Sequence, residues 1–166
     1  SRISLLVKRI SSESDRLVAV TTLSFDIAVN DLLLPLSVGA EIVLASRDDA
    51  ADGAVLTTLI EESQATSMQA TPATWRVLIE AGWRGDRRFK ALCGGEALST
   101  DLARELLDRT GSLWNMYGPT ETTVWSTCWR VNAPEQGIRI GRPIANTVTD
   151  VLGHTLVQYR LLARRA

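Results

Sequence analysis

Short apolar runs rich in β-branched residues alternate with stretches of helical periodicity, and this alternation limits the possible fold more than any other feature of the sequence. Strands are expected at residues 17–20, 40–44, 67–70, 89–93 and 113–117. Helices are expected between them, over residues 25–34 and after residues 52, 71 and 99. Strands that alternate with helices are typical of an α/β domain and argue against a helical bundle or a β-sandwich.

Several of the expected helices carry start or stop signals. Asp52 is a plausible N-cap, and the pair Thr71-Pro72 supplies a capping hydroxyl followed by a proline at the first helical position. Ser99 or Thr100 caps the next helix, and Gly111 is expected to end it. These signals predict helices that start directly after the strands.

The pattern changes after the last of these strands. Residues 124–131 and 138–151 have a β-rich composition, and no helix is expected between them. We expect a second, β-rich element beside the α/β layer. Residues 1–151 are interpreted as one domain core, and residues 152–166 as an atypical tail.

Composition and charge exclude several classes of function. The 18 basic and 19 acidic side chains nearly cancel, which disfavours nucleic-acid binding. Cys93, Cys128 and His154 cannot assemble a zinc site, so the cysteines are expected to be plain buried residues. The sequence has no apolar run of ~20 residues and no secretory signal, so we expect a cytoplasmic protein without a membrane partner.

The strongest chemical signal is the run Asn115-Met116-Tyr117-Gly118-Pro119-Thr120-Glu121. A strand that ends in this way offers a flat ring for stacking, a tight turn that lets backbone approach a ligand, and a carboxylate suited to Mg²⁺. These groups suit a nucleotide site. An ordinary β-turn with a solvated glutamate remains the alternative from chemistry alone.

This run resembles the core motif of the AMP-forming adenylation family, which includes the adenylation domains of non-ribosomal peptide synthetases, acyl-CoA ligases and luciferases. The resemblance implies that Tyr117 lies against the adenine, that Thr120 reaches the α-phosphate, and that Glu121 helps to hold Mg²⁺. Thr120 and Glu121 are therefore the expected catalytic residues, with ATP and Mg²⁺ as cofactors.

Four further segments resemble the same family in the same order, at residues 23–28, 69–75, 94–98 and 140–144. The resemblance implies a fragment of the large N-terminal subdomain of an AMP-forming ligase. The residues expected to bind the nucleotide are Gly94, Gly95, Glu96, Asn115, Tyr117, Gly118 and Thr120. A dinucleotide-binding oxidoreductase is disfavoured, because Gly94-Gly95 lacks the Gly-x-Gly-x-x-Gly spacing and by itself is more often a turn.

Asp26 is the candidate for substrate choice. From the residues alone it is an acid at a helix start, where the helix dipole favours it. In peptide-synthetase adenylation domains the aspartate at this place pairs with the α-ammonium of the amino acid, which favours an amino acid over an acyl acid. The resemblance implies a pocket lined by Asp26, Ile27, Asn30, Gln69, Leu92, Gly94, Met116, Val124 and Trp125.

This pocket resembles those associated with glycine. Trp125, Met116 and Leu92 fill the space that a larger side chain needs, although a misfit of one methylene costs only ~1–3 kcal/mol. Asn30 departs from the pattern, in which an apolar residue is expected, so another small, polar amino acid stays open.

Parts of the family's catalytic machinery have no counterpart in the sequence. The serine-rich residues 11–14 contain no glycine and no following lysine, so they are interpreted as a solvated turn and not as a phosphate loop. The ribose-binding Gly-Asp segment and the C-terminal lysine are also missing. We expect an incomplete, inactive chain whose end reflects truncation or a change of reading frame.

The function that the resemblance implies is ATP-dependent formation of an aminoacyl-adenylate. The aminoacyl group would then pass to the phosphopantetheine thiol of a peptidyl carrier protein, beside adjacent synthetase modules. A non-catalytic remnant or interaction module with the same fold, or a fragment of an acyl-CoA ligase, remains an alternative.

Overall fold

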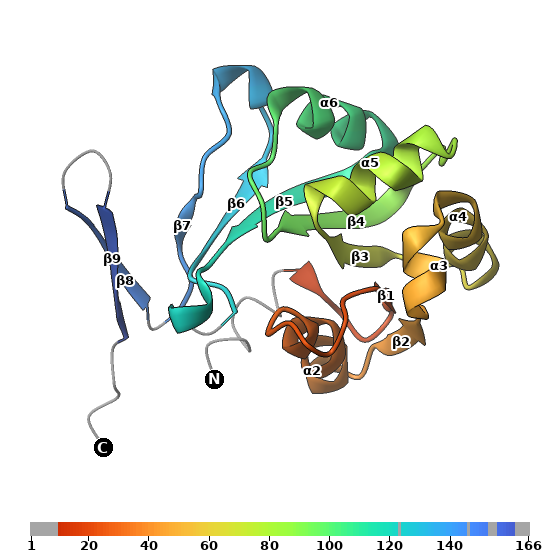
Figure 1. The fold of residues 1–166 in the computed structure, drawn as a ribbon, viewed down its shortest axis with the longest axis horizontal. Helices are drawn as coiled ribbons and strands as arrows, with labels where there is room; N and C mark the ends of the chain where they lie inside the picture. The colour runs from red at the N-terminus through yellow and green to blue at the C-terminus, as the bar shows by residue number, and fades with distance from the viewer. Residues whose placement is uncertain (1–9, 123, 146, 153–155, 162–166) are drawn as a thin grey trace.

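The computed structural model describes residues 10–122, 124–145, 147–152 and 156–161 (Figure 1). Its centre is a seven-stranded sheet with the order β2-β1-β3-β4-β5-β6-β7. The first five strands in this order run parallel, and β6 and β7 join antiparallel to their neighbours. The strands are β1 (Arg16–Ala19), β2 (Glu41–Leu44), β3 (Ser67–Ala70), β4 (Asp86–Gly94), β5 (Thr110–Tyr117), β6 (Thr127–Val131) and β7 (Arg142–Pro143).

Helices cover both faces of the sheet. On one face α4, α5 and α6 pack against a large core that contains Val18, Met68 and Leu113. The neighbouring residues Leu17 and Ala19 point to the other face, where they contact α2. The helices are α2 (Ala28–Val38), α3 (Arg47–Ala51), α4 (Gly53–Glu62), α5 (Pro72–Glu80) and α6 (Thr100–Arg109), with short 3₁₀ turns η1 (Thr120–Thr122) and η2 (Pro134–Gln136).

The five predicted strands are confirmed, and so are the starts of three predicted helices, α4, α5 and α6. Asp52 accepts hydrogen bonds from the backbone N–H groups of the first turn of α4, at 2.9 and 3.2 Å. Thr71 and Ser99 cap α5 and α6 in the same way. Helix α2 begins at Ala28, three residues later than predicted, because residues 21–27 form bends and turns. Helix α3 was not predicted.

Two other expectations are corrected. Gly111 does not end α6 but lies inside β5, where an added Cβ would be 2.0 Å from the carbonyl oxygen of Arg87. The β-rich segment after residue 124 is present but divided, since β6 and β7 continue the main sheet. Only β8 (Thr147–Leu152) and β9 (Leu156–Leu161) form a separate hairpin, which stands apart from the sheet in Figure 1. The domain boundary at residue 151 stays a prediction.

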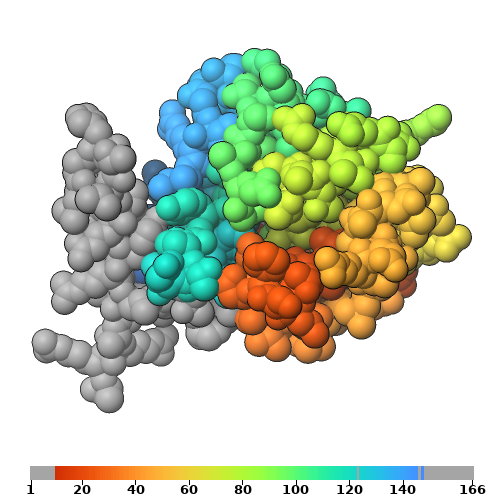
Figure 2. All heavy atoms as spheres, viewed as in Figure 1, coloured from red at the N-terminus to blue at the C-terminus, as the bar shows by residue number. Residues whose placement is uncertain are grey.

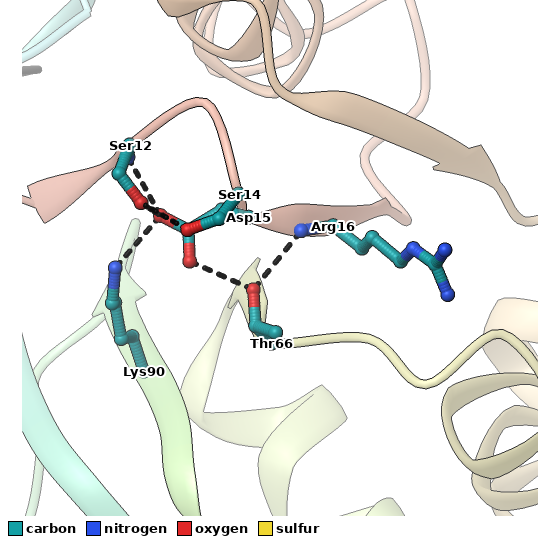
Figure 3. A network of polar contacts seen from close by, with 6 residues as sticks. All are labelled: Ser12, Ser14, Asp15, Arg16, Thr66 and Lys90. Atoms are coloured by element: carbon teal, nitrogen blue, oxygen red, sulfur yellow. Dashed lines mark hydrogen bonds and ion pairs between the residues drawn. The ribbon is translucent and has the colours of Figure 1, made fainter.

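A buried carboxylate joins β1, β3 and β4 at the edge of the sheet where β1 and β3 begin (Figure 3). Asp15 forms an ion pair with Lys90 at 2.7 Å and accepts hydrogen bonds from the hydroxyl of Thr66, at 2.8 Å, and from the backbone N–H of Ser12, at 2.7 Å. Burial alone would raise the pKa of Asp15, but the bonds from Lys90, Ser12 and Thr66 outweigh it and lower the pKa. The serine-rich turn is exposed at residues 12–14, as predicted, but Ser11 is buried, which the prediction of a solvated turn over residues 11–14 did not foresee. Asp15 anchors the turn.

Among the described residues no helix is both long and apolar enough to cross a membrane.

Replacing Lys90 with methionine should lower the free energy of unfolding by about 2–3 kcal/mol, because Asp15 would stay buried without its cation. Arg88→Met is the control, since Arg88 pairs with Asp86 on the surface, where an exposed ion pair contributes little to stability. Urea denaturation at pH 7 measures both. The effect of Lys90→Met should shrink in acid, because the lowered pKa of Asp15 makes its stabilisation disappear as the pH falls through that value. Equal losses in the two variants would contradict this role of Asp15.

Candidate functional site

The parallel strands end together at one edge of the sheet, and the predicted site residues gather there. Ligands of open α/β sheets bind at such carboxyl edges, where loops from neighbouring strands meet. Strands β3, β4 and β5 end at Ala70, Gly94 and Tyr117. Figure 2 shows the orange-red surface around α2 beside the teal surface around η1 and the green loop that follows β4. Segments far apart in the sequence therefore meet at this edge.

A cavity of about 490 Å³ lies above the ends of β4 and β5. Five of the predicted nucleotide-binding residues line it, namely Gly95, Glu96, Asn115, Tyr117 and Gly118. Gly94 is buried below them, and Thr120 and Glu121 are exposed in η1, directly after Pro119 at the rim. The third wall is formed by residues 138–140, of which only Ile140 lies in a segment that the family resemblance had indicated.

Backbone geometry shapes this cleft. An added Cβ on Gly118 would lie 2.4 Å from the carbonyl oxygen of Val124, so only glycine allows this close approach. The Asn115 side-chain amide donates to the carbonyl oxygen of Arg139, at 2.9 Å, and so ties the third wall to β5. Arg139 and Tyr117 both line the cleft; Arg139 brings a positive charge, and Tyr117 is 36% exposed. The cleft thus combines an aromatic ring, small turns and a cation.

The predicted substrate residues form a second, buried group on the sheet face that carries α2. Leu92, Met116, Val124 and Trp125 make one apolar cluster, against which Ile27 packs. An added Cβ on Gly94 would lie 2.4 Å from the ring of Trp125. Asp26 precedes Ile27 in the turn that enters α2 and is half-buried.

A hydrogen-bond network crosses this group. The carboxamide oxygen of Gln69 accepts from Asn30 Nδ2, at 2.7 Å, and from the indole N–H of Trp125, at 3.1 Å. Its nitrogen donates to the carbonyl oxygen of Ile27, at 3.3 Å, and to Asp31 Oδ1, at 2.6 Å. The network therefore joins α2, β3 and the loop before β6.

Asp31 is the residue that sequence reasoning missed here. It is 1% exposed and also accepts from the backbone N–H of Thr21, at 3.3 Å. Burial raises the pKa of Asp31 to about 7, although the hydrogen bonds from Thr21 and Gln69 oppose the shift. The signal was the polar pair Asn30-Asp31 inside a mostly apolar helix, because such residues are rarely buried without partners.

The two groups of residues adjoin each other. Met116 lines the nucleotide cleft and also belongs to the apolar cluster. Gly95 lines the cleft, and an added Cβ on it would lie 3.4 Å from Ile27 Cδ1. The turn that carries Asp26 is therefore next to the cleft that carries Tyr117.

The donor set for a metal is small. No group of three His, Cys, Asp or Glu side chains that could hold an ion occurs in the part of the chain that the structure describes. Glu121 fits Mg²⁺ nonetheless, because Mg²⁺ is often bound by one or two carboxylates together with substrate phosphates and water. Cys93 is buried as predicted, and burial together with the charge of Glu96 raises the pKa of its thiol to about 12; Cys128 is only half-buried.

Comparison with known proteins gives consistent matches. The family model for AMP-binding enzymes matches residues 3–158. The chain is 46% identical over 142 residues to a PKS-NRPS hybrid synthetase of Aspergillus candidus and 43% identical over 145 residues to a dimodular nonribosomal peptide synthase of Bacillus subtilis. These matches cover 85% and 87% of this chain but only 6% of either relative.

A solved structure agrees with these matches. The fold superimposes with a TM-score of 0.84 and 41% identity on a four-domain nonribosomal peptide synthetase bound to AMP and glycine. The superposition covers 96% of this chain and 12% of that one. The observed α/β architecture is therefore that of part of an adenylation domain, as the resemblance implied.

The free energy of unfolding should fall as the pH rises from 5 to 8, by about 3 kcal/mol, because of Asp31. Its folded-state pKa of about 7 lies above the ordinary value of 3.8, so its stabilisation is complete below pH 3.8 and is lost as the pH rises through 7. Urea denaturation of the wild type and of Asp31→Asn measures the slope. Asp31→Asn should lack this dependence of the free energy of unfolding on pH. If the variant showed the same slope as the wild type, Asp31 would not titrate in this range.

Proposed function

The chain belongs to the AMP-binding enzyme family, as part of a non-ribosomal peptide synthetase adenylation domain, and on this premise we propose that it selects a small amino acid, preferably glycine, for activation as an aminoacyl-adenylate. In this reaction a carboxylate oxygen of the amino acid attacks the α-phosphorus of ATP, and pyrophosphate leaves. The observation that carries the proposal is the contact between the buried apolar cluster, to which four predicted substrate residues belong, and the cleft that holds the nucleotide motif.

Asp26 would hold the amino acid. Its carboxylate stands at the start of α2 beside Ile27, which packs against the apolar cluster. A carboxylate in this position can accept charge-assisted hydrogen bonds from an α-ammonium group. Acyl acids carry no such group, and Asp26 therefore favours an amino acid over the substrate of an acyl-CoA ligase.

The size of the pocket would favour glycine. The ring of Trp125 lies over Gly94, and Met116 and Leu92 fill the same apolar cluster. Little space remains for a substrate side chain. The synthetase structure with bound AMP and glycine supports this choice by similarity. Asn30 is polar at a position where an apolar residue is expected, so serine is the competing substrate to test.

The nucleotide would occupy the cleft between residues 95–98 and 138–140. There Tyr117 offers its ring to the adenine, and Thr120 reaches the α-phosphate from η1. Glu121 would hold Mg²⁺, which neutralises phosphate charge when bound. Arg139 adds positive charge on the far wall.

The next step would involve a carrier protein. The phosphopantetheine thiol of a peptidyl carrier domain attacks the aminoacyl carbonyl, so that a thioester forms and AMP leaves. The two curated relatives are a PKS-NRPS hybrid synthetase and a dimodular nonribosomal peptide synthase, and this chain spans about 6% of the length of each. The partner domains would therefore belong to the same parent assembly.

Amino-acid-dependent pyrophosphate exchange tests the proposal in the intact synthetase that carries this chain. Glycine should be favoured over alanine and serine by at least about tenfold in kcat/KM. Asp26→Asn should lower kcat/KM for glycine by about 10- to 100-fold, because a charge-assisted bond is lost. Asp101→Asn is the control, since that carboxylate is exposed on α6, and this substitution should leave kcat/KM for glycine unchanged.

Two results would contradict the proposal. An aliphatic acid that outperformed every amino acid would identify an acyl ligase. If neither an amino acid nor an aliphatic acid supported pyrophosphate exchange, the chain would be a non-catalytic remnant.

A further inference from the structure

The carboxamide of Gln69 is fully engaged inside the protein. An amide side chain has two N–H donors and an oxygen with two lone pairs. Both donors of Gln69 are used, by Asp31 and by the carbonyl oxygen of Ile27, and its oxygen accepts from Asn30 and Trp125. The side chain is 1% exposed. Gln69 therefore has no free group for a ligand, and its influence on a substrate passes through its neighbours.

Two of these neighbours determine which way the amide points. The indole N–H of Trp125 can only donate, so it requires the oxygen of Gln69. An ionised Asp31 can only accept, so it requires the nitrogen. Asp31 lies on the far side of Gln69 from Trp125 in this chain of bonds. If Asp31 could not accept, the Gln69 nitrogen would lose its shortest bond and the amide could turn over.

The position of the Trp125 ring depends on its contacts with neighbouring residues, because the backbone that precedes it is strained. The preceding residue, Val124, has a φ of 67°, which is unfavourable for a β-branched residue and persists only where surrounding contacts impose it. The indole ring then lies against Gly94, at the bottom of the proposed pocket. The indole N–H of Trp125 donates a hydrogen bond to Gln69, and this bond fixes how far the ring enters the pocket.

Asp31 itself stands outside the pocket. Its other oxygen accepts from the backbone N–H of Thr21, which links α2 to the end of β1. In the part of the chain that the structure describes, no lysine or arginine forms an ion pair with Asp31. A buried, unpaired carboxylate is costly, so its position needs an explanation beyond stability.

We infer that Asp31 is a positioning residue for substrate size: it orients Gln69, which holds the Trp125 ring over Gly94 and so excludes side chains larger than that of glycine. The inference rests on the proposed function. Asp31 is not among the residues predicted to line the substrate pocket, and its effect on selectivity would pass through Gln69.

The test compares glycine with alanine in pyrophosphate exchange by the intact synthetase. Asp31→Leu removes the acceptor and should reduce the glycine-to-alanine ratio of kcat/KM by roughly tenfold, because an unmet hydrogen bond loosens the amide. The change should lie mainly in the KM for alanine, which falls. Asp31→Asn keeps one acceptor oxygen for Gln69 and should hold the ratio within about threefold of the wild type.

Two further variants separate selectivity from stability. Gln69→Leu removes the transmitting amide and should lower the ratio as Asp31→Leu does, and it decides the question if Asp31→Leu fails to fold. Asp15→Asn removes a hydrogen-bonded buried acid at the opposite edge of the sheet. It should lower the free energy of unfolding and leave the ratio unchanged.

A direct readout does not require turnover. The indole N–H of Trp125, identified in an NMR spectrum by its loss in Trp125→Phe, should shift and exchange faster with water in Asp31→Leu but not in Asp31→Asn. A wild type inactive with every amino acid would refute the proposed function, and this measurement would still test the chain of bonds. A folded Asp31→Leu with an unchanged ratio and an unchanged indole signal would overturn the inference.

Discussion

The parallel alignment of β1, β3, β4 and β5 is the constraint on which the rest of the structure depends. Parallel strands place all their carboxyl ends at one edge, so residues separated by up to about a hundred positions meet there without any long connection crossing the sheet. Each strand also alternates its side chains between the two faces. Gln69, Leu92 and Met116 consequently reach the face that carries α2, while Met68, Ala91 and Cys93 pack under α4, α5 and α6.

The two edges of the sheet use buried charge differently. At the amino edge Asp15 has a cation, two hydroxyls and a backbone N–H as partners, which compensate its burial and hold three strands together. At the carboxyl edge Asp31 has only hydrogen-bond donors, and its pKa is raised to about 7. Asp15, whose charge is balanced by a cation, can hold strands together. Among the described residues Asp31 has no cation as a partner, and its pKa is raised beside the proposed pocket, which is the arrangement expected of a functional site that fixes the orientation of its neighbours.

Local features were predictable from sequence, and features that need distant partners were not. The caps at Asp52, Thr71 and Ser99 act within one helical turn, so residue type and spacing identify them. The role of Gly111 was predicted wrongly because a glycine near a helix end can either end the helix or allow another backbone to come close. Here it allows the approach of Arg87, which belongs to the neighbouring strand β4 and is distant in the sequence.

The candidate site divides in the same way. The motif around Tyr117 was recognisable as a continuous run, and its lining of a cleft with Gly95 follows from the order of the strands. Asp31 and Arg139 were missed, because one depends on a partner in β3 and the other on a loop carried past β5 by the antiparallel strands. Only the folded arrangement shows that Gln69 is saturated and cannot bind a ligand itself.

The central claim is that an ammonium site at Asp26 and an adenine site at Tyr117 open onto one cleft. A crystal structure of the intact synthetase with a non-hydrolysable glycyl-adenylate analogue measures this most directly. The account predicts the analogue's ammonium nitrogen about 3 Å from the Asp26 carboxylate and its adenine stacked about 4 Å from the Tyr117 ring. An analogue that binds with its adenine at Tyr117 and its ammonium group remote from Asp26 would contradict it.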